Sequence, residues 1–140
     1  MSEYTAFAEQ IVAAGSNVLF TDAPIDNSTS IIHRAGSGVI TLRGLTRQCR
    51  ARFRISFGAN IAIPTGGTVE AISTAISVNG EALPASTMIV TPAAVENYFN
   101  VSSEALVDVP VGCCLTIGVR NISSQSISFA NSNLIVERVA

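Results

Sequence analysis

The chain has 140 residues, of which 48% are apolar and only 13% are charged, and its formal net charge is −2 at pH 7. This length is typical of one domain with one hydrophobic core, and so small a net charge points to neither nucleic acid nor a membrane as a partner. The chain contains eight arginines and no lysine. Arginine is enriched and lysine depleted where proteins contact each other, although a biased base composition of the source genome would leave the same pattern.

The N-terminus carries no targeting signal that the sequence reveals. It includes Glu3 and Glu9 and lacks both a basic segment and a long apolar run, which a secretory signal peptide requires. No stretch of the chain reaches the roughly 18 consecutive apolar residues of a membrane span. Tyr4, Phe7 and Ile11 follow the spacing of an amphipathic helix, but a helix this short is marginal without tertiary support.

The rest of the chain alternates apolar and small polar residues in short runs that glycine, proline, asparagine and serine interrupt. A period of two is the pattern of β-strands with one buried face. Asn79-Gly80 is the sequence of a tight hairpin turn, residues 60–67 are predicted to form a loop, and residues 91–97 allow at most one helical turn. The predicted strands occupy residues 39–43, 51–57, 71–78, 115–120, 127–129 and 134–139.

These elements predict one all-β domain. The chain shows no internal repeat, linker or low-complexity segment, so eight to ten short strands have to pack around one core as a sandwich or jelly roll.

Five of the eight arginines lie within twelve residues that contain no acid. Alternation places Arg50, Arg52 and Arg54 on one face of one strand, where their repulsion requires acids on neighbouring strands or an anionic partner. Pairing inside the chain is the favoured explanation; contact with an acidic partner surface or between protomers is the alternative. Nucleic acid fits less well because stacking aromatic residues are scarce. The arginine segment comprises Arg43, Arg47, Arg50, Arg52 and Arg54, and the acids expected to face it are Glu104, Asp108 and Glu137.

The sequence does not assemble a catalytic or metal site. His33 is the only histidine, and three cysteines are too few and too badly spaced for a zinc site. The motifs of serine hydrolases, nucleotide-binding loops and zinc proteases are absent, and no pair among the ten acids is singled out for glycoside hydrolysis. We expect no enzyme activity and no cofactor. Cys49, Cys113 and Cys114 are expected to be reduced thiols that face the core, with a bridge from Cys49 as the alternative.

Four segments occur in an order that resembles a known family. They are FGANIAIPTGGT (57–68), ISVNG (76–80), VDVPVG (107–112) and LTIGVRN (115–121). They resemble the tumour-necrosis-factor-like jelly rolls at the tips of exosporium glycoproteins and in phage head-fibre and decoration proteins. The resemblance implies an antiparallel jelly roll of about ten strands, a tight homotrimer and no chemistry of its own. The resemblance covers residues 15–140, which we take as the jelly-roll domain. It also favours strands over a helix at Thr5–Val12 and Asn17–Phe20, so residues 1–14 are treated as an N-terminal arm or first strand.

The resemblance further implies which residues form the trimer. In such trimers the strand that would carry Tyr98 and Phe99 borders the threefold axis. Alternation sends one of these side chains into the sandwich and the other outward. Tyr98 and Phe99 are therefore the candidate trimer interface, and capping of the core by both rings is the alternative.

The resemblance, the absent collagen-like stalk and the absent signal peptide together favour a structural protein of a virion. We expect a phage capsid decoration or head-fibre protein on the virion surface, assembled in the host cytoplasm. Its expected partners are itself, as a homotrimer, and a major capsid or other virion protein; nucleic acid and membrane are not expected. A receptor- or carbohydrate-binding fibre tip that contacts host glycans, and a bacterial spore or cell-surface protein, are the alternatives.

Overall fold

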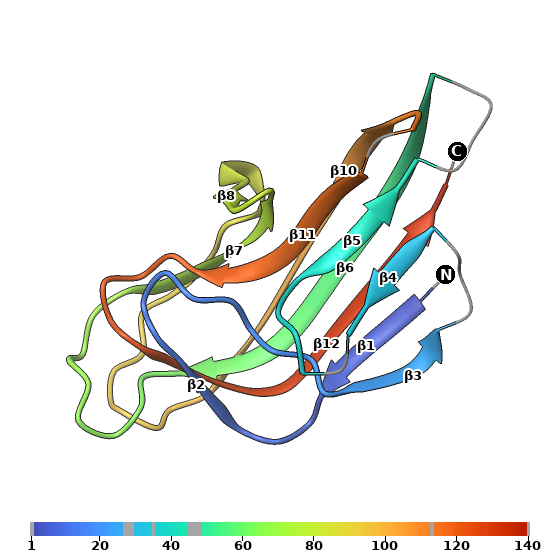
Figure 1. The fold of residues 1–140 in the computed structure, drawn as a ribbon. Coiled ribbons are helices and arrows are strands. Elements are labelled where there is room, and N and C mark those ends of the chain that lie inside the picture. The colour runs from blue at the N-terminus through green and yellow to red at the C-terminus, as the bar shows by residue number, and fades with distance from the viewer. Residues whose placement is uncertain (1, 27–29, 35, 45–48, 113, 140) are drawn as a thin grey trace.

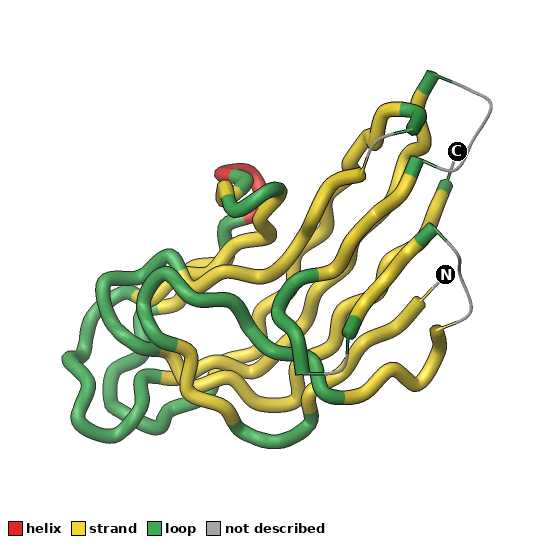
Figure 2. The backbone as a smooth tube through the Cα atoms, in the orientation of Figure 1, coloured by secondary structure: helices red, strands yellow, loops and turns green. Residues whose placement is uncertain are grey.

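The computed structural model describes residues 2–26, 30–34, 36–44, 49–112 and 114–139. In this part of the chain every regular element is a strand except one 3-10 turn, η1, at Pro84–Ser86, so the predicted all-β class is confirmed (Figure 1, Figure 2). The same residues contain no helix long and apolar enough to cross a membrane. The described strands are β1 (Ser2–Ala6), β2 (Gln10–Val12), β3 (Asp22–Asp26), β4 (Ile31–His33), β5 (Ile40–Arg43), β6 (Arg50–Ala62), β7 (Ile72–Val78), β8 (Glu81–Ala82), β9 (Met88–Val90), β10 (Phe99–Pro110), β11 (Cys114–Asn121) and β12 (Ile127–Arg138).

The strands form two antiparallel sheets that pack as a sandwich (Figure 1). Sheet 1 has the order β10-β6-β12-β1-β3, with β2 paired to the start of β12; sheet 2 has the order β4-β5-β11-β7-β8, with β9 paired to β7. In both sheets, strands far apart in the sequence are neighbours: β12 lies between β1 and β6, and β11 lies between β5 and β7. Such crossovers are typical of a jelly roll and not of consecutive hairpins.

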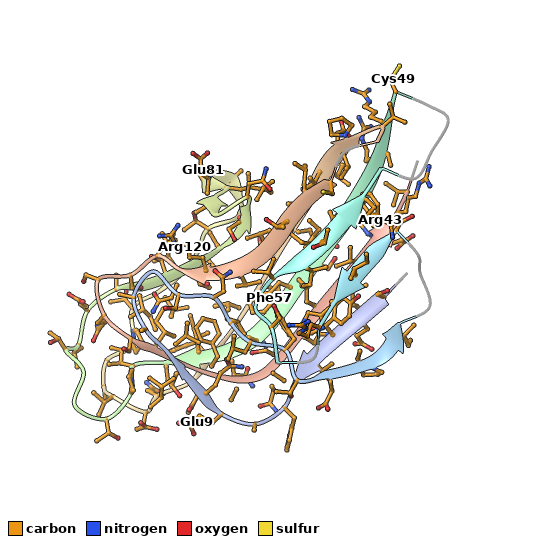
Figure 3. The ribbon with its side chains drawn as sticks, in the orientation of Figure 1. Glu9, Arg43, Cys49, Phe57, Glu81 and Arg120 are labelled. Atoms are coloured by element: carbon orange, nitrogen blue, oxygen red, sulfur yellow. The ribbon has the colours of Figure 1, made fainter. Side chains whose placement is uncertain are left out.

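The core forms where the inward faces of the two sheets meet. On β6 the side chains of Phe53 and Phe57 are buried and alternate with the more exposed Arg52 and Arg54, as the period of two predicted. Phe57 lies between the sheets (Figure 3), and its ring contacts the edge of Phe20 with the ring centroids 6.4 Å apart. This edge-to-face contact favours one fixed packing of the core.

The predicted loop at residues 60–67 begins later than expected, because β6 ends only at Ala62. Asn60 continues the ladder on both sides: it pairs with Asn100 on β10 and with Ala130 on β12. Pairing with two neighbouring strands therefore extends β6 into residues whose composition is typical of a loop.

The predicted strands at residues 127–129 and 134–139 are one strand, β12. Its pairing register with β6 shifts between Ala130 and Asn133, and Asn131 has a positive φ of 54°. Asparagine tolerates this conformation better than most residues. The interruption in the hydrophobic pattern is thus a β-bulge inside one strand and not a turn between two.

The N-terminal strand β1 pairs with β12 on one side and β3 on the other, and its Tyr4 is fully buried. The strand expected at residues 17–20 is not present as such, which corrects that prediction. Asn17 forms only an isolated bridge to Arg120, while the backbone amide of Val18 donates to the Val119 carbonyl at 2.8 Å. The segment therefore lies against β11, but the contact is too short to form a regular strand.

Two glycines let this segment approach sheet 2 closely. A Cβ atom added at Gly118 would lie 2.7 Å from the Gly38 carbonyl oxygen, and one added at Gly38 would lie 2.8 Å from the Asn17 Cβ. The Asn17 side-chain amide donates a hydrogen bond to the same Gly38 carbonyl at 3.2 Å. The absence of a side chain at both glycines is therefore a packing requirement.

The hairpin predicted at Asn79-Gly80 joins β7 and β8. Both residues have positive φ, 52° and 84° respectively, as a type I′ turn requires. The side-chain oxygen of Asn79 also accepts a hydrogen bond from the Thr116 amide at 3.0 Å, which fixes the turn to β11.

Candidate interaction surfaces

The arginine segment is divided between the two sheets. Arg50, Arg52 and Arg54 extend from β6 on the outer face of sheet 1, as the alternation predicted. Arg43 lies at the end of β5 in sheet 2 with its side chain exposed (Figure 3), and Arg47 lies outside the described residues. The four arginines whose positions are described therefore do not form one charged cluster.

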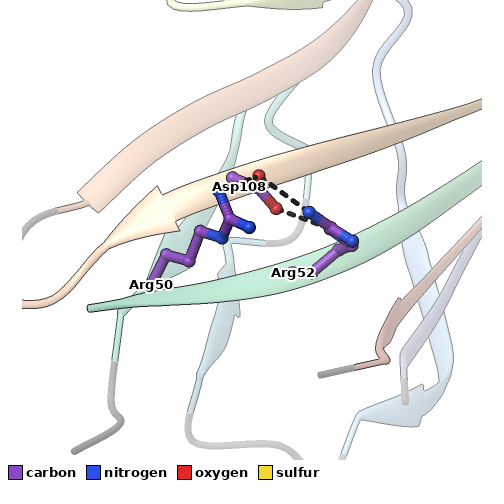
Figure 4. Close-up of polar contacts among 3 residues, drawn as sticks. All are labelled: Arg50, Arg52 and Asp108. Atoms are coloured by element: carbon purple, nitrogen blue, oxygen red, sulfur yellow. Dashed lines mark hydrogen bonds and ion pairs between the residues drawn. The ribbon is translucent and has the colours of Figure 1, made fainter. Parts of the chain in front are cut away.

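Asp108 on β10 pairs with two of these arginines (Figure 4). It lies opposite Arg52 in the ladder between β6 and β10. Arg52 donates two hydrogen bonds to its carboxylate, from Nε at 2.8 Å and from Nη2 at 3.2 Å, and a guanidinium nitrogen of Arg50 lies 3.5 Å from the same group. A planar guanidinium fits a carboxylate well in this forked arrangement.

The other two acids that were expected to face the arginines are also engaged. Arg54 donates to Glu137 on β12 at 2.8 Å, whereas Glu104 accepts the hydroxyl of Ser56 at 2.6 Å. Pairing inside the chain, the favoured explanation, thus accounts for the arginines on β6. Contact between this segment and a partner or a neighbouring protomer stays a prediction.

The ion pair predicts a pH response of Asp108. The hydrogen bond from Arg52 holds the pKa of Asp108 below its ordinary value; desolvation opposes this effect, and the charges of Arg52 and Arg50 add to it. We expect Arg52→Gln to raise the pKa of Asp108 toward the ordinary value, as measured from the side-chain carboxyl resonance in an NMR titration. Because the folded pKa is lowered, the pair stabilises the fold above the unfolded pKa, and this contribution is lost as the pH falls through the folded pKa.

Arg54→Gln is the matched control, because Arg54 pairs with Glu137 and not with Asp108. It should leave the pKa of Asp108 unchanged. Both partners of the Arg52–Asp108 pair are solvent-exposed, so the accompanying change in stability should be small. An Asp108 pKa that is the same in Arg52→Gln and in the wild type would show that this pair does not control the titration.

Tyr98 is held inside the chain by hydrogen bonds. Strand β10 begins at Phe99, so Tyr98 precedes the strand, which corrects the prediction that both aromatic residues lie on it. Ser128 Oγ donates to Glu9 at 3.0 Å and lies 2.8 Å from the Tyr98 hydroxyl; since Ser128 has one hydroxyl hydrogen, Tyr98 is the donor of the second bond. Burial raises the pKa of Tyr98; a hydrogen bond that Ser128 can donate to the phenolate opposes this effect, and the charge of Glu9 adds to it.

Phe99, by contrast, is 40% exposed. It pairs in register with the buried Ile61, so it lies on the inward side of β10 at an open end of the sandwich. Of the two aromatic residues, Phe99 is the one whose ring is available to a partner. Their place in a trimer interface stays a prediction.

Large apolar side chains are exposed along one edge of the sandwich, where β9 of sheet 2 lies beside β10 of sheet 1. Ile89 is 64% exposed and Leu106 is 62% exposed, and Phe99 lies on the same edge. β10 is the last strand of sheet 1 and is 12 residues long. Long strands at a sheet edge and exposed apolar rows are surfaces through which chains associate. Ile89, Phe99 and Leu106 are termed the β10 edge.

Leu106 was not among the predicted site residues, although its position in the sequence carries a signal. Leu106 lies between Glu104 and Asp108 at a spacing of two, so it shares their outward face. A leucine on an otherwise polar face is the pattern of an interface residue, but the surrounding valines obscure it. Ile89 belongs to a strand of three residues, too short for periodicity to reveal.

A groove of about 760 Å³ opens on the outer side of sheet 2. Its walls are the segment 10–19, Val39 before β5 and Gly80 in the β7–β8 turn, and Arg120 of β11 reaches into it. The side chain of Arg120 is half-buried. The volume of the groove falls in the range of small-molecule sites. This surface, termed the Arg120 groove, was not predictable from the sequence because its parts are far apart in the chain.

The remaining candidate groups do not converge on a common site. The ring of His33 packs on Tyr4 with the centroids 4.5 Å apart, and its Nε2 lies 2.9 Å from the Ser37 carbonyl oxygen, which ties the ring to its own loop. No three histidine, cysteine or acidic side chains come together as metal ligands in the described ranges.

The expectation that the thiols face the core is wrong for two of them. Cys49 and Cys114 are exposed; Cys49 lies at the tip of the sandwich before β6 (Figure 3). Cys114 pairs in register with the exposed Arg43, so it falls on the outward face of β11. Cys113 lies outside the described residues. The reduced state of the thiols stays a prediction.

Comparison with known proteins identifies the fold. No protein-family model and no curated protein sequence matches the chain. The globular domain of zebrafish complement 1qA protein matches with a TM-score of 0.64 at 6% identity, over 99% of this chain and 96% of that chain. The C-terminal domain of EclA, a sugar-binding protein, has a TM-score of 0.42 at 16% identity, over 94% and 80% of the two chains. CBM35 from Cellvibrio japonicus Abf62 has a TM-score of 0.40 at 9% identity, over 99% and 98%.

At these identities only the first match is close enough to support a conclusion, and it concerns the fold alone. The chain is an all-β jelly-roll module with the architecture of the complement 1q globular domain, and the predicted fold class is confirmed. The oligomeric state, the location and the partner of the chain have to be inferred from the surfaces described above.

Proposed function

We propose that this chain is a non-catalytic structural module that works as a symmetric homotrimer on the surface of a larger particle. The observation that carries the proposal is the β10 edge, where Ile89, Phe99 and Leu106 are exposed on an isolated protomer. Exposed apolar side chains on a long strand at a sheet edge are typical of surfaces through which chains associate. With 13% charged residues, the chain has few charges with which to keep that edge solvated.

A closed ring requires two different surfaces on each protomer that fit each other. The β10 edge is one of them. At the opposite side of sheet 1, Phe7 follows β1 and Ile25 lies on β3, and both are exposed. We infer that these residues form the second surface. Stable obligate interfaces commonly bury more than about 2,000 Å² and resemble a hydrophobic core divided between subunits.

The particle that fits best is a virion. The sequence resemblance to phage head-fibre and decoration proteins supports a trimer that decorates the capsid, with a major capsid or other virion protein as its second partner. Quantitative mass spectrometry of purified virions should then detect the chain at a copy number that is a multiple of three. Absence of the chain from the particles would refute the virion location but not the homotrimer.

Assembly is the decisive test. The wild-type chain at micromolar concentration should sediment at three times the protomer mass of 14.6 kDa. Leu106→Asp introduces a carboxylate into a desolvated interface, and Arg54, which lies opposite position 106 in the ladder, is already paired with Glu137. The added charge is therefore costly there, and we expect it to dissociate the trimer into monomers in analytical ultracentrifugation. Far-ultraviolet circular dichroism distinguishes a folded monomer from an unfolded chain.

Val69→Asp is the matched control. Val69 is 51% exposed in the loop between β6 and β7 and belongs to neither apolar surface, so this variant should remain trimeric. A monomeric wild type would refute the proposal. A Leu106→Asp variant that stays trimeric would exclude the β10 edge as the interface.

A second function, recognition of a receptor or carbohydrate by the assembled particle, is favoured by one specific observation. The Arg120 groove is open and has the volume of a ligand site, and its lining shares no residue with the β10 edge or with the surface of Phe7 and Ile25. Assembly would therefore leave the groove accessible.

A further inference from the structure

The Arg120 groove contains a half-buried cation that lacks an acidic partner. Arg120 donates a hydrogen bond from Nη1 to the Gly80 carbonyl oxygen at 2.6 Å, and it takes part in none of the ion pairs found in the described part of the chain. The described lining residues of the groove include no acid. Glu81, which follows the turn at the start of β8 (Figure 3), forms no ion pair with Arg120 either.

This arrangement differs from that of Arg52 and Arg54, which pair with carboxylates of the chain itself. A partly desolvated cation without a counter-ion is unfavourable, and the guanidinium keeps most of its five N–H donors for another acceptor. The groove therefore complements an anion, and a carboxylate fits the planar guanidinium best.

The free side of the guanidinium is accessible because a glycine borders it. A Cβ atom added at Gly15 would lie 3.7 Å from Nη2 of Arg120, so any larger side chain would cover this nitrogen. Gly15 also has a positive φ of 79°, which restricts the position to glycine in practice. The hydrogen bond to Gly80 holds the other nitrogen in place. Together they present one edge of the guanidinium to the groove.

The rim of the groove combines apolar and hydrogen-bonding groups. Ile11, Leu19 and Val39 are exposed aliphatic side chains on its walls. Ser16 and Asn17 add a hydroxyl and a side-chain amide. A ligand that satisfies all of these groups carries a carboxylate, several hydroxyl or amide groups and a small apolar face.

The backbone of the walls is already hydrogen-bonded, which argues against a peptide. The amides of Gly15 and Val18 donate to β11, and the amide of Leu19 donates to the side chain of Gln10. The Gly38 carbonyl accepts from Asn17. An extended peptide usually binds by adding a strand to a free sheet edge, and these backbone groups are not available for that pairing.

We propose that the Arg120 groove binds a carboxylated sugar residue. The carboxylate lies on Arg120, the hydroxyl groups contact Ser16 and Asn17, and a methyl group or the C–H face of the ring packs against Ile11 and Leu19. The groove is formed within one protomer, so binding does not require the trimer, and the two proposals can fail separately.

The test uses the full chain and two soluble probes, the methyl glycosides of N-acetylneuraminic acid and of glucuronic acid. Saturation-transfer NMR and calorimetric titration should show binding of at least one of them. Arg120→Gln should weaken that binding about tenfold or more, because it removes the charged donor. Val39→Trp should weaken it similarly by filling the groove while leaving Arg120 in place. Arg54→Gln, a matched arginine substitution on sheet 1, should bind as the wild type does.

The outcomes separate the ligand classes. Equal binding of neutral methyl glucoside would overturn the role of the carboxylate. Competition by N-acetylvaline as strong as that of the acidic glycosides would overturn the sugar and indicate a peptide-like carboxylate. No saturable binding of either acidic glycoside at about 10 mM, where a site with a Kd of about 1 mM is mostly filled, would refute the proposal. Circular dichroism and thermal unfolding verify that each variant is folded.

Discussion

Asn121→Ala is expected to lower the free energy of unfolding by about 3–5 kcal/mol, measured by urea denaturation at fixed protomer concentration. Asn121 is fully buried at the end of β11. Its side-chain amide donates to the carbonyl oxygens of Val12 and Gln125, both at 2.9 Å, and its oxygen accepts from the Ser123 amide at 2.9 Å. Alanine leaves one buried and two partly buried backbone groups without this partner, which costs more than the loss of the bonds themselves.

Asn60→Ala is the matched control for this prediction. Asn60 also makes two side-chain amide bonds, to Asn131 at 3.2 Å and from Asn100 at 3.2 Å, but on the solvent-exposed face of sheet 1. Water can replace both bonds, so we expect a loss of about 0.5 kcal/mol or less. Similar losses for Asn60→Ala and Asn121→Ala would show that burial of the amide is not what makes Asn121 important.

Gly118→Ala is expected to destabilise the fold by about 3 kcal/mol, at the upper end of the range for overpacking. The added Cβ atom would lie 2.7 Å from the Gly38 carbonyl oxygen and 3.0 Å from the Asn17 side-chain nitrogen. The nearer atom belongs to the backbone, so it cannot rotate away. The segment that carries Asn17 has to move from β11, and thermal or urea unfolding should report the loss.

Gly58→Ala tests whether the cost comes from the close contact or from the loss of glycine in a strand. Gly58 also lies within a strand, β6, but an added Cβ atom would be 3.4 Å from the flexible side chain of Asn133. We expect a change within about 0.5 kcal/mol. A Gly118→Ala variant as stable as Gly58→Ala would mean that the loop relaxes without cost.

Both substitutions act on the wall of the Arg120 groove. Asn121 holds Val12, and Gly118 lets Asn17 approach β11; Val12 and Asn17 both line the groove. Substitutions at Asn121 or Gly118 that leave the chain folded should therefore weaken ligand binding without affecting the β10 edge. The separation of the two surfaces allows assembly and recognition to be measured independently on the same chain.

The alternating pattern predicted the parts of the structure that depend on local sequence. It placed Phe53 and Phe57 inside and Arg52 and Arg54 outside, because side chains on a strand point to opposite faces in turn. The turn at Asn79-Gly80 was predictable because few other residues accept positive φ at both positions. The acids near the arginines were anticipated as a group, but the register that sets Asp108 opposite Arg52 was not.

Local pattern failed wherever a distant strand decided the outcome. Asn60 looked like a loop residue, yet β10 and β12 pair with it on both sides. Cys114 looked like a core residue because its neighbours are apolar, but its pairing with Arg43 turns it outward. Each error reverses once the pairing partner is known, because a shift of one residue moves a side chain to the other face.

The sequence by itself determined the all-β class, the turn chemistry and the faces of the main strands, because these depend on a period of two and on backbone preferences of single residues. The tertiary structure alone decided the features that bear on function. Leu106 and Ile89 form one edge only because β10 and β9 lie side by side. Arg120 meets Gly15, Gly80 and the aliphatic rim only because segments far apart in the chain pack against β11. Non-local pairing brings these groups together, and no local pattern encodes it.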